Sequence, residues 1–179
     1  MFPPIKVRLR GLDPSTKYIV FMDIVPADNH RYKYLYHSCQ WSVCGSGEES
    51  DPSGRIYLHP DSPAAGSLWT AQDAISFEKL KLTNNSSPVV NGQIPLHSMQ
   101  KYLPRVHVVA ALSGLPVRSQ AKAEMATTFA YPETCFITVT AYQNQKITRL
   151  KIESNPFAKG FRENSRIRSD LFFNVSHIL

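Results

Sequence analysis

A hydrophobic period of two constrains the fold of this chain more than any other feature. In residues 5–10, three apolar side chains alternate with three cationic ones (Ile5, Val7 and Leu9 against Lys6, Arg8 and Arg10). Alternation of this kind is typical of a β-strand with one buried and one solvated face. The pattern therefore predicts a first strand whose solvent face is basic.

Several other segments also have strand character. Residues 17–25 are richly apolar, which favours a central strand, and shorter alternating or apolar runs follow at residues 32–36, 41–44, 55–59, 105–111 and 134–141. Turn residues separate these runs, and residues 45–54 and 113–127 have the composition of loops. About eight or nine short strands with many turns predict an antiparallel β-sandwich.

Residues 74–83 change their alternation partway along. Ile75 and Phe77 have one parity, whereas Leu80 and Leu82 have the other. A change of parity inside a strand usually marks a β-bulge, which we expect near Glu78. After the bulge, Lys79 and Lys81 share the face opposite the leucines.

The end of the chain changes to a helical period. Apolar residues three apart begin after Asn144, which is a suitable N-cap, and Ser154-Asn155-Pro156 ends the predicted helix. A second, very short helical turn follows, in which Phe157 and Phe161 are four apart and share one face. We therefore expect two short helices near the C-terminus.

Composition excludes some classes of protein and favours an anionic partner. The 179 residues have a net charge of +6, distributed as +3 over residues 1–36, −1 over residues 37–140 and +4 over residues 141–179. Two basic ends around a neutral middle favour nucleic acid as the partner, although solubility alone also explains such a charge. The longest apolar run, residues 106–112, is too short to cross a membrane, and we expect no signal peptide at this start.

Cysteine and catalytic signals are weak. The odd number of cysteines (Cys39, Cys44 and Cys135) does not fit a secreted disulfide framework, and His37 with the first two lacks a second ligand pair for zinc. No phosphate loop, nucleophile elbow or His-Glu-x-x-His motif is present. We expect no enzyme, no metal and no cofactor.

The two phenylalanines near the C-terminus have two interpretations. A Phe pair on one helical face is commonly core packing, but Lys159 and Arg162 are interleaved with Phe157 and Phe161. Apolar wedges flanked by cations suit entry into the DNA minor groove. Likewise, the lysines of residues 79–81 either contact phosphates or lie on a solvated strand face.

Two segments near the C-terminus closely resemble the T-box transcription factors. They are residues 138–152 (TVTAYQNQKITRLKI) and residues 155–162 (NPFAKGFR). Further motifs of this resemblance follow in family order: residues 1–3 (MFP), 11–14 (GLDP), 22–26 (MDIVP), 59–63 (HPDSP), 77–85 (FEKLKLTNN), 97–99 (HSM) and 132–134 (PET). Together they indicate a T-box domain over residues 1–163, followed by an unassigned tail, residues 164–179.

The resemblance implies a mainly β, immunoglobulin-like antiparallel β-sandwich with short C-terminal helices. It also implies sequence-specific binding of double-stranded DNA at half-sites of the TCACACCT/AGGTGTGA type. The DNA-binding residues it implies are Phe157, Ala158, Lys159, Phe161, Arg162, Lys79, Lys81, Lys6, Thr140, Gln143, Thr148 and Lys151. Among them, the two phenylalanines enter the minor groove, the short Ala158 lets their helix lie close, and the lysines at 6, 79 and 81 face the phosphate backbone.

The same resemblance sets expectations for biology. It implies a nuclear regulator of RNA polymerase II transcription, with developmental genes as targets and no membrane association. A second copy on paired half-sites, other transcription factors and corepressors are the further partners it suggests. Relatives usually carry Gly-Arg-Arg just before Met-Phe-Pro, and an arginine there reads a guanine, so without that segment we expect weaker or less specific binding.

Two other functions fit the residues. The first is a β-sandwich that binds a protein through the Phe turn and does not bind DNA. The second is a secreted glycosylated sandwich, which the three Asn-x-Ser sequons at Asn84, Asn85 and Asn174 allow. The unpaired number of cysteines argues against the second.

Overall fold

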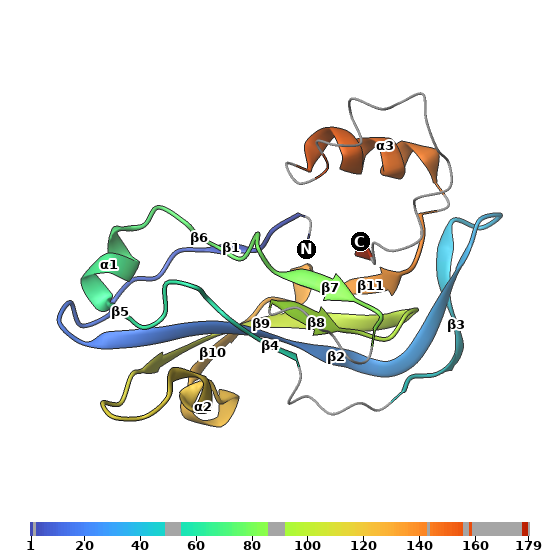
Figure 1. Cartoon of the computed structure of the whole chain (residues 1–179). Coiled ribbons are helices and arrows are strands. Elements are labelled where there is room, and N and C mark those ends of the chain that lie inside the picture. The colour runs from blue at the N-terminus through green and yellow to red at the C-terminus, as the bar shows by residue number, and fades with distance from the viewer. Residues whose placement is uncertain are drawn as a thin grey trace.

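The computed structural model of the chain describes residues 1, 3–48, 55–85, 92–142, 144–155, 158 and 177–178. Two long antiparallel strands, β2 (Lys17–Leu35) and β9 (Gln100–Ala110), form its centre (Figure 1). Their pairing runs from Tyr18 opposite Ala110 to Arg31 opposite Gln100, with a shift of register between Pro26 and Arg31. The apolar stretch at the start of β2 is buried on both faces, which explains its near-continuous hydrophobicity.

The large sheet extends from this pair. Its order is β12-β11-β9-β2-β3, while β10 also pairs with β9, and β4 and β5 also pair with β2. These strands are β3 (Gln40–Ser46), β4 (Ile56–Leu58), β5 (Ala64–Ala65), β10 (Thr127–Ala130), β11 (Phe136–Val139) and β12 (His177–Ile178). All of these pairings are antiparallel.

A second layer covers one face of the large sheet. It contains the antiparallel pair β1 (Lys6–Val7) with β6 (Ile75–Ser76), and the parallel pair β7 (Lys81–Thr83) with β8 (Gln93–Pro95). Between the layers lies the main core, to which both contribute: Val20, Met22, Ile24, Val106 and Phe136 from the large sheet, and Ile75, Phe77, Leu80 and Ile94 from the second layer. Burial of this apolar surface is the main stabilising force of the sandwich.

The helix α1 (Gly66–Ala71) closes one end of the core. Trp69 points inward with none of its surface exposed, and its indole N–H donates to the carbonyl of Tyr18 at 3.2 Å. The first residue of the helix lies so close to the backbone of Asp13 that a Cβ on Gly66 would be 2.1 Å from that carbonyl oxygen. Glycine is therefore required there for the helix to seat.

The opposite face of the large sheet has its own small cover. Ile19 and Phe21 pack there against Ala121, which follows the short helix α2 (Val117–Gln120) and precedes the turn η2 (Ala123–Met125). The predicted loop 113–127 thus contains two helical turns. The side chain of Gln120 stabilises this segment. Its Oε1 accepts from the N–H of Leu112 at 2.7 Å, and its Nε2 donates to the Leu115 carbonyl at 2.9 Å.

The mainly β antiparallel sandwich with short helices confirms the predicted fold class, and besides the loop 113–127 further details of the prediction were wrong. The expected strands 17–25 and 32–36 are one strand, β2, because β9 and β3 provide partners on either side of Pro26. The expected bulge near Glu78 is instead a turn between β6 and β7, closed by the Leu80 N–H on the Phe77 carbonyl at 3.1 Å. Lys79 consequently lies in this turn, not on a strand face with Lys81.

The C-terminal helix was predicted well. α3 (Gln145–Ser154) begins after Asn144, whose side-chain oxygen accepts from the N–H of Lys146 at 2.9 Å, and it ends one residue before Asn155. The following Phe turn lies outside the described residues except for Ala158. No helix in the described part of the chain is long and apolar enough to cross a membrane.

Candidate functional site

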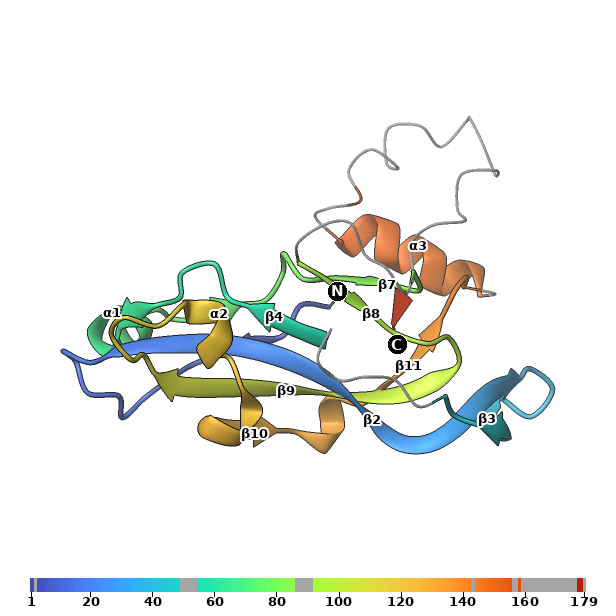
Figure 2. The same cartoon turned by 60° about the horizontal axis from the view of Figure 1, so that its bottom comes forward.

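α3 lies on one side of the sandwich. It lies above the end of the sandwich where β7, β8 and β11 meet, away from α1 (Figures 1 and 2). Four described residues of the predicted DNA-binding set lie in these elements or next to them: Lys81, Thr140, Thr148 and Lys151. Their side chains can therefore be considered together.

Lys151 is the most unusual of these residues. It projects from α3, and its Nζ lies 5.4 Å from the centre of the Tyr142 ring. Burial lowers the pKa of Lys151 to about 8, and among the described residues Nζ has no hydrogen-bond partner. The ammonium group is thus desolvated, and among the described residues its contact is with the aromatic face of Tyr142.

Lys81 of β7 lies near the same point although it is distant in sequence. The amino group of Met1 donates to the carbonyl of Leu80, next to Lys81. The pKa of that amine is lowered to about 6, first by burial and then by the positive charges of Lys151 and Lys81. Lys151 of α3 and Lys81 of β7 therefore both lie near the Met1 amine, and their positive charge in this region favours an anion.

Lys79 and Lys6 extend this positive region. Lys79 is exposed in the turn that precedes β7. The carbonyl of Ile5 accepts from the N–H of Phe77 at 3.0 Å, which places the exposed Lys6 of β1 beside the same turn. We call the side chains of Lys6, Lys79, Lys81 and Lys151 the lysine cluster.

The remaining predicted DNA-binding residues differ in exposure and in hydrogen bonding. Thr140 is exposed after β11, whereas the hydroxyl of Thr148 donates within α3 to the carbonyl of Asn144 at 3.3 Å. Ala158 is 7% exposed, and its N–H donates to the Asn155 carbonyl at 3.0 Å. Five predicted residues lie outside the described part of the chain: Phe157, Lys159, Phe161, Arg162 and Gln143.

Sequence reasoning missed Tyr142 as the ring beneath Lys151. Burial raises the pKa of Tyr142 to about 12, so its hydroxyl stays protonated and the ring stays neutral. The two residues are nine positions apart, across a helix boundary, so no simple period connects them. Only the packing of α3 shows the pair.

A buried polar cluster on the large sheet was also missed. Arg105 Nε donates to Asp23 at 2.9 Å, while His107 Nε2 lies 2.9 Å from the same carboxylate and His107 Nδ1 lies 2.8 Å from the Thr128 hydroxyl. Burial alone raises the pKa of Asp23, but His107 and Arg105 outweigh it, and the net shift is downward. The sequence did carry a signal for this cluster, namely polar residues inside apolar strands: Asp23 in β2, and Arg105 and His107 in β9.

This cluster has the residue types of a hydrolase triad, but it is not accessible to a substrate. The imidazole of His107 has no exposed surface and stacks on Phe21 at 4.6 Å, so a substrate cannot reach it. The contacts instead join β2, β9 and β10. Among the described residues no group of three His, Cys, Asp or Glu side chains is arranged to hold a metal, and all three cysteines are free thiols.

Comparison with known proteins places this chain in a family. The T-box family model matches residues 1–163. The chain is 53% identical to T-box transcription factor TBX18 of Homo sapiens over 96% of its own length and 28% of that protein. It is 53% identical to TBX20 of Danio rerio over 93% of the chain and 37% of that protein, and 55% identical to TBX5-A of Danio rerio over 90% and 32%.

The chain spans about a third of the length of the curated relatives it matches. The identity extends across nearly the whole chain, including the strands that build the sandwich and the helix α3 that carries part of the lysine cluster. The chain belongs to the T-box family.

Proposed function

We propose that this chain is the DNA-binding domain of a transcription factor and that it binds duplex DNA at TCACACCT/AGGTGTGA half-sites. The names of its relatives, T-box transcription factors, support the class of function. The observation that supports the proposal is the lysine cluster, in which Lys81 of β7 and Lys151 of α3 both lie close enough to the Met1 amine to lower its pKa. Cations gathered from separate elements are suited to a row of phosphates.

The proposed contacts divide into two kinds. The lysine cluster neutralises backbone phosphates, which fixes the position of the protein on the duplex without reading sequence. Phe157 and Phe161 enter the minor groove, flanked by Lys159 and Arg162. Ala158 is small and buried, and in this proposal its short side chain lets the Phe turn lie close to the DNA.

Gln143, Thr140 and Thr148 complete the proposed interface near the start of α3. Thr148 supports DNA binding indirectly, since its hydroxyl is already used within the helix. In the cell, the proposed protein acts in the nucleus on developmental genes. A second copy on paired half-sites, other transcription factors and corepressors are its proposed partners.

A titration at two salt concentrations tests the function. The chain is mixed with a labelled half-site duplex or with a scrambled duplex of the same length, and anisotropy is followed. We expect tighter binding to the half-site at both salt concentrations and weaker binding to both duplexes at high salt. Equal affinity for the two duplexes would contradict sequence-specific recognition, and the absence of binding would contradict the DNA-binding role altogether.

A further inference from the structure

A groove lies beside α1, and α1 is far from α3 in the structure (Figure 1). Its volume is about 650 Å³, and it is lined mostly by apolar side chains: Pro63, Ala64, Ala65, Leu68 and Ala71. Leu68 is 60% exposed, so its side chain adds to the apolar surface of the groove. The DNA-binding role proposed above uses none of these residues.

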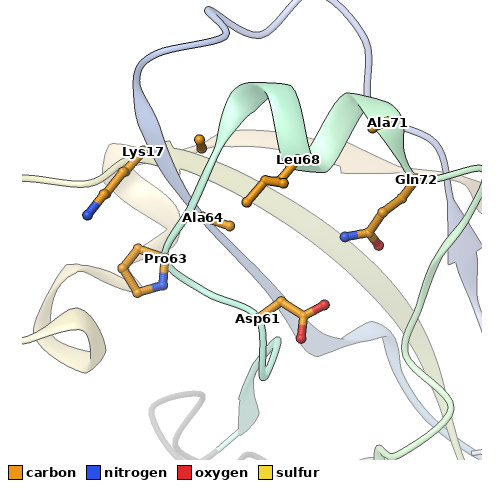
Figure 3. Close-up of a pocket in the computed structure, with 8 residues that line it drawn as sticks. Lys17, Asp61, Pro63, Ala64, Leu68, Ala71 and Gln72 are labelled. Atoms are coloured by element: carbon orange, nitrogen blue, oxygen red, sulfur yellow. The ribbon is translucent and has the colours of Figure 1, made fainter.

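The groove carries one charge of each sign on opposite sides. Lys17 lies on one side, and Asp61 lies on the other with Gln72, while Ala64 and Leu68 lie between them (Figure 3). Within the described part of the chain, no acidic side chain pairs with Lys17. Its ammonium group is therefore available to an anion from outside.

Asp61 has no lysine or arginine in ion-pair distance within the described residues. The basic group that contacts it there is His59, whose Nδ1 lies 3.8 Å from the carboxylate. The same Nδ1 accepts a hydrogen bond from the N–H of Asp61 at 3.3 Å, which requires an unprotonated nitrogen. Burial between Trp69 and Phe77 lowers the pKa of His59 further, so the imidazole is neutral at neutral pH.

The walls of the groove are firmly held. Trp69 anchors α1 in the core through its indole hydrogen bond, and Gly66 seats the start of the helix against Asp13. On the other wall, the Ser62 hydroxyl donates to the Val20 carbonyl at 3.0 Å. A preformed groove binds without the cost of ordering its own walls.

We propose that this groove binds a short amphipathic segment of a partner protein. That segment carries an apolar side chain for the surface formed by Leu68 and Ala64, an acidic side chain for Lys17, and a basic side chain for Asp61. Charge complementarity selects this occupant, because nucleic acid would bring its phosphates against the unneutralised carboxylate of Asp61. Since α1 and α3 lie far apart in the structure, the segment and DNA can bind together.

The test selects peptides with the intact chain and then reverses charges. A phage-displayed library of short linear peptides is panned on the wild-type chain after depletion on the Leu68→Asp variant, whose exposed site tolerates the change without loss of core packing. We expect the enriched peptides to share an apolar residue between an acid and a base. One such peptide is then synthesised and titrated by fluorescence anisotropy.

Charge reversal decides the outcome. Lys17→Glu and Asp61→Lys should each lower the affinity for that peptide by about tenfold. Reversing the matching charge in the peptide should restore the affinity. Lys33→Glu, at an exposed lysine on the other end of β2, is the matched control and should leave affinity unchanged. Circular dichroism verifies that every variant is folded.

Three results would overturn the proposal. The first is a library that yields no peptide with a preference for the wild-type chain over Leu68→Asp, and the second is a set of peptides insensitive to both charge reversals. The third is a dimer of this chain in sedimentation velocity that Leu68→Asp dissolves, because the groove would then bind a second copy. Because the readout is peptide binding, failure here leaves the half-site titration unaffected.

Discussion

The ammonium group of Lys151 lies 5.4 Å from the centre of the Tyr142 ring, under the helix that carries it. Burial holds the pKa of this lysine at about 8, well below its ordinary 10.5. The structure therefore keeps a charged group where charge is unfavourable. Such a cost is typical of a residue retained for binding and not for stability.

Lys151→Met should separate these two roles. The substitution removes the partly desolvated charge but keeps a chain of similar length, so the Tm at pH 7 should rise by about one to three degrees. DNA affinity should fall because one phosphate contact is lost. Thermal unfolding and duplex titration measure the two effects, with the exposed Lys146→Met as the control; a lower Tm for Lys151→Met would mean that the ammonium stabilises the fold.

Lys151 also predicts a pH dependence of stability. Its pKa is about 8 when folded and 10.5 in the reference state, so the unfolded chain binds more protons between these values and the stability of the wild type should rise with pH there. The destabilising contribution is complete below pH 8 and disappears as pH approaches 10.5. Urea unfolding from pH 7 to 10 should therefore show the advantage of Lys151→Met shrinking, and a constant difference would contradict the lowered pKa.

Asp23→Asn should destabilise the large sheet. Asp23 is 7% exposed and binds Arg105 through both carboxylate oxygens, so its loss leaves a guanidinium without its partner. We expect a loss of about 3 kcal/mol at pH 7, by urea unfolding. Because the pKa of Asp23 is lowered in the folded state, its contribution is present above the ordinary value of 3.8 and is lost as pH falls through the lower folded value.

The difference in free energy of unfolding between Asp23→Asn and the wild type should accordingly become smaller only in strong acid. Asp73→Asn is the matched control, since the Asp73 side chain is fully exposed and contacts Arg8 only at 3.7 Å. A loss of similar size for both variants would indicate that the buried position of Asp23 has no special weight.

Arg162→Gln should change the salt dependence of DNA binding. If Arg162 meets a backbone phosphate, the slope of log affinity against log salt should flatten by about one contact. Lys33→Gln, on the β2–β3 hairpin, should leave the slope as it is. An unchanged slope for Arg162→Gln removes this residue from the phosphate contacts.

Phe161→Ala distinguishes groove insertion from core packing. As a minor-groove wedge, Phe161 should be needed for affinity but not for folding, so binding should weaken while the Tm stays nearly constant. A stability loss of about 3 kcal/mol or more would instead identify it as a core residue. If both affinity and Tm are unchanged, the protein-binding interpretation of the Phe turn gains support.

The local sequence pattern was sufficient to predict features that depend only on residues close together in the chain. Asn144 caps α3 as expected because its short side chain reaches the N–H of Lys146, and that interaction is complete within three residues. The alternation of residues 5–10 likewise gives exposed Lys6, Arg8 and Arg10. The strand character of the chain and the family motifs were readable in the same way.

Other features depended on partners distant in the chain. The parity change around Glu78 is compatible with a bulge or a turn, and only the pairing of β6 with β1 and of β7 with β8 selected the turn. The single strand β2 also required β9 and β3 on either side of Pro26. Residue order constrains local backbone geometry. The burial of Lys151 over Tyr142, however, depends on which surfaces pack together, and so does the placement of Lys17 and Asp61 beside α1. Tertiary packing alone decides both.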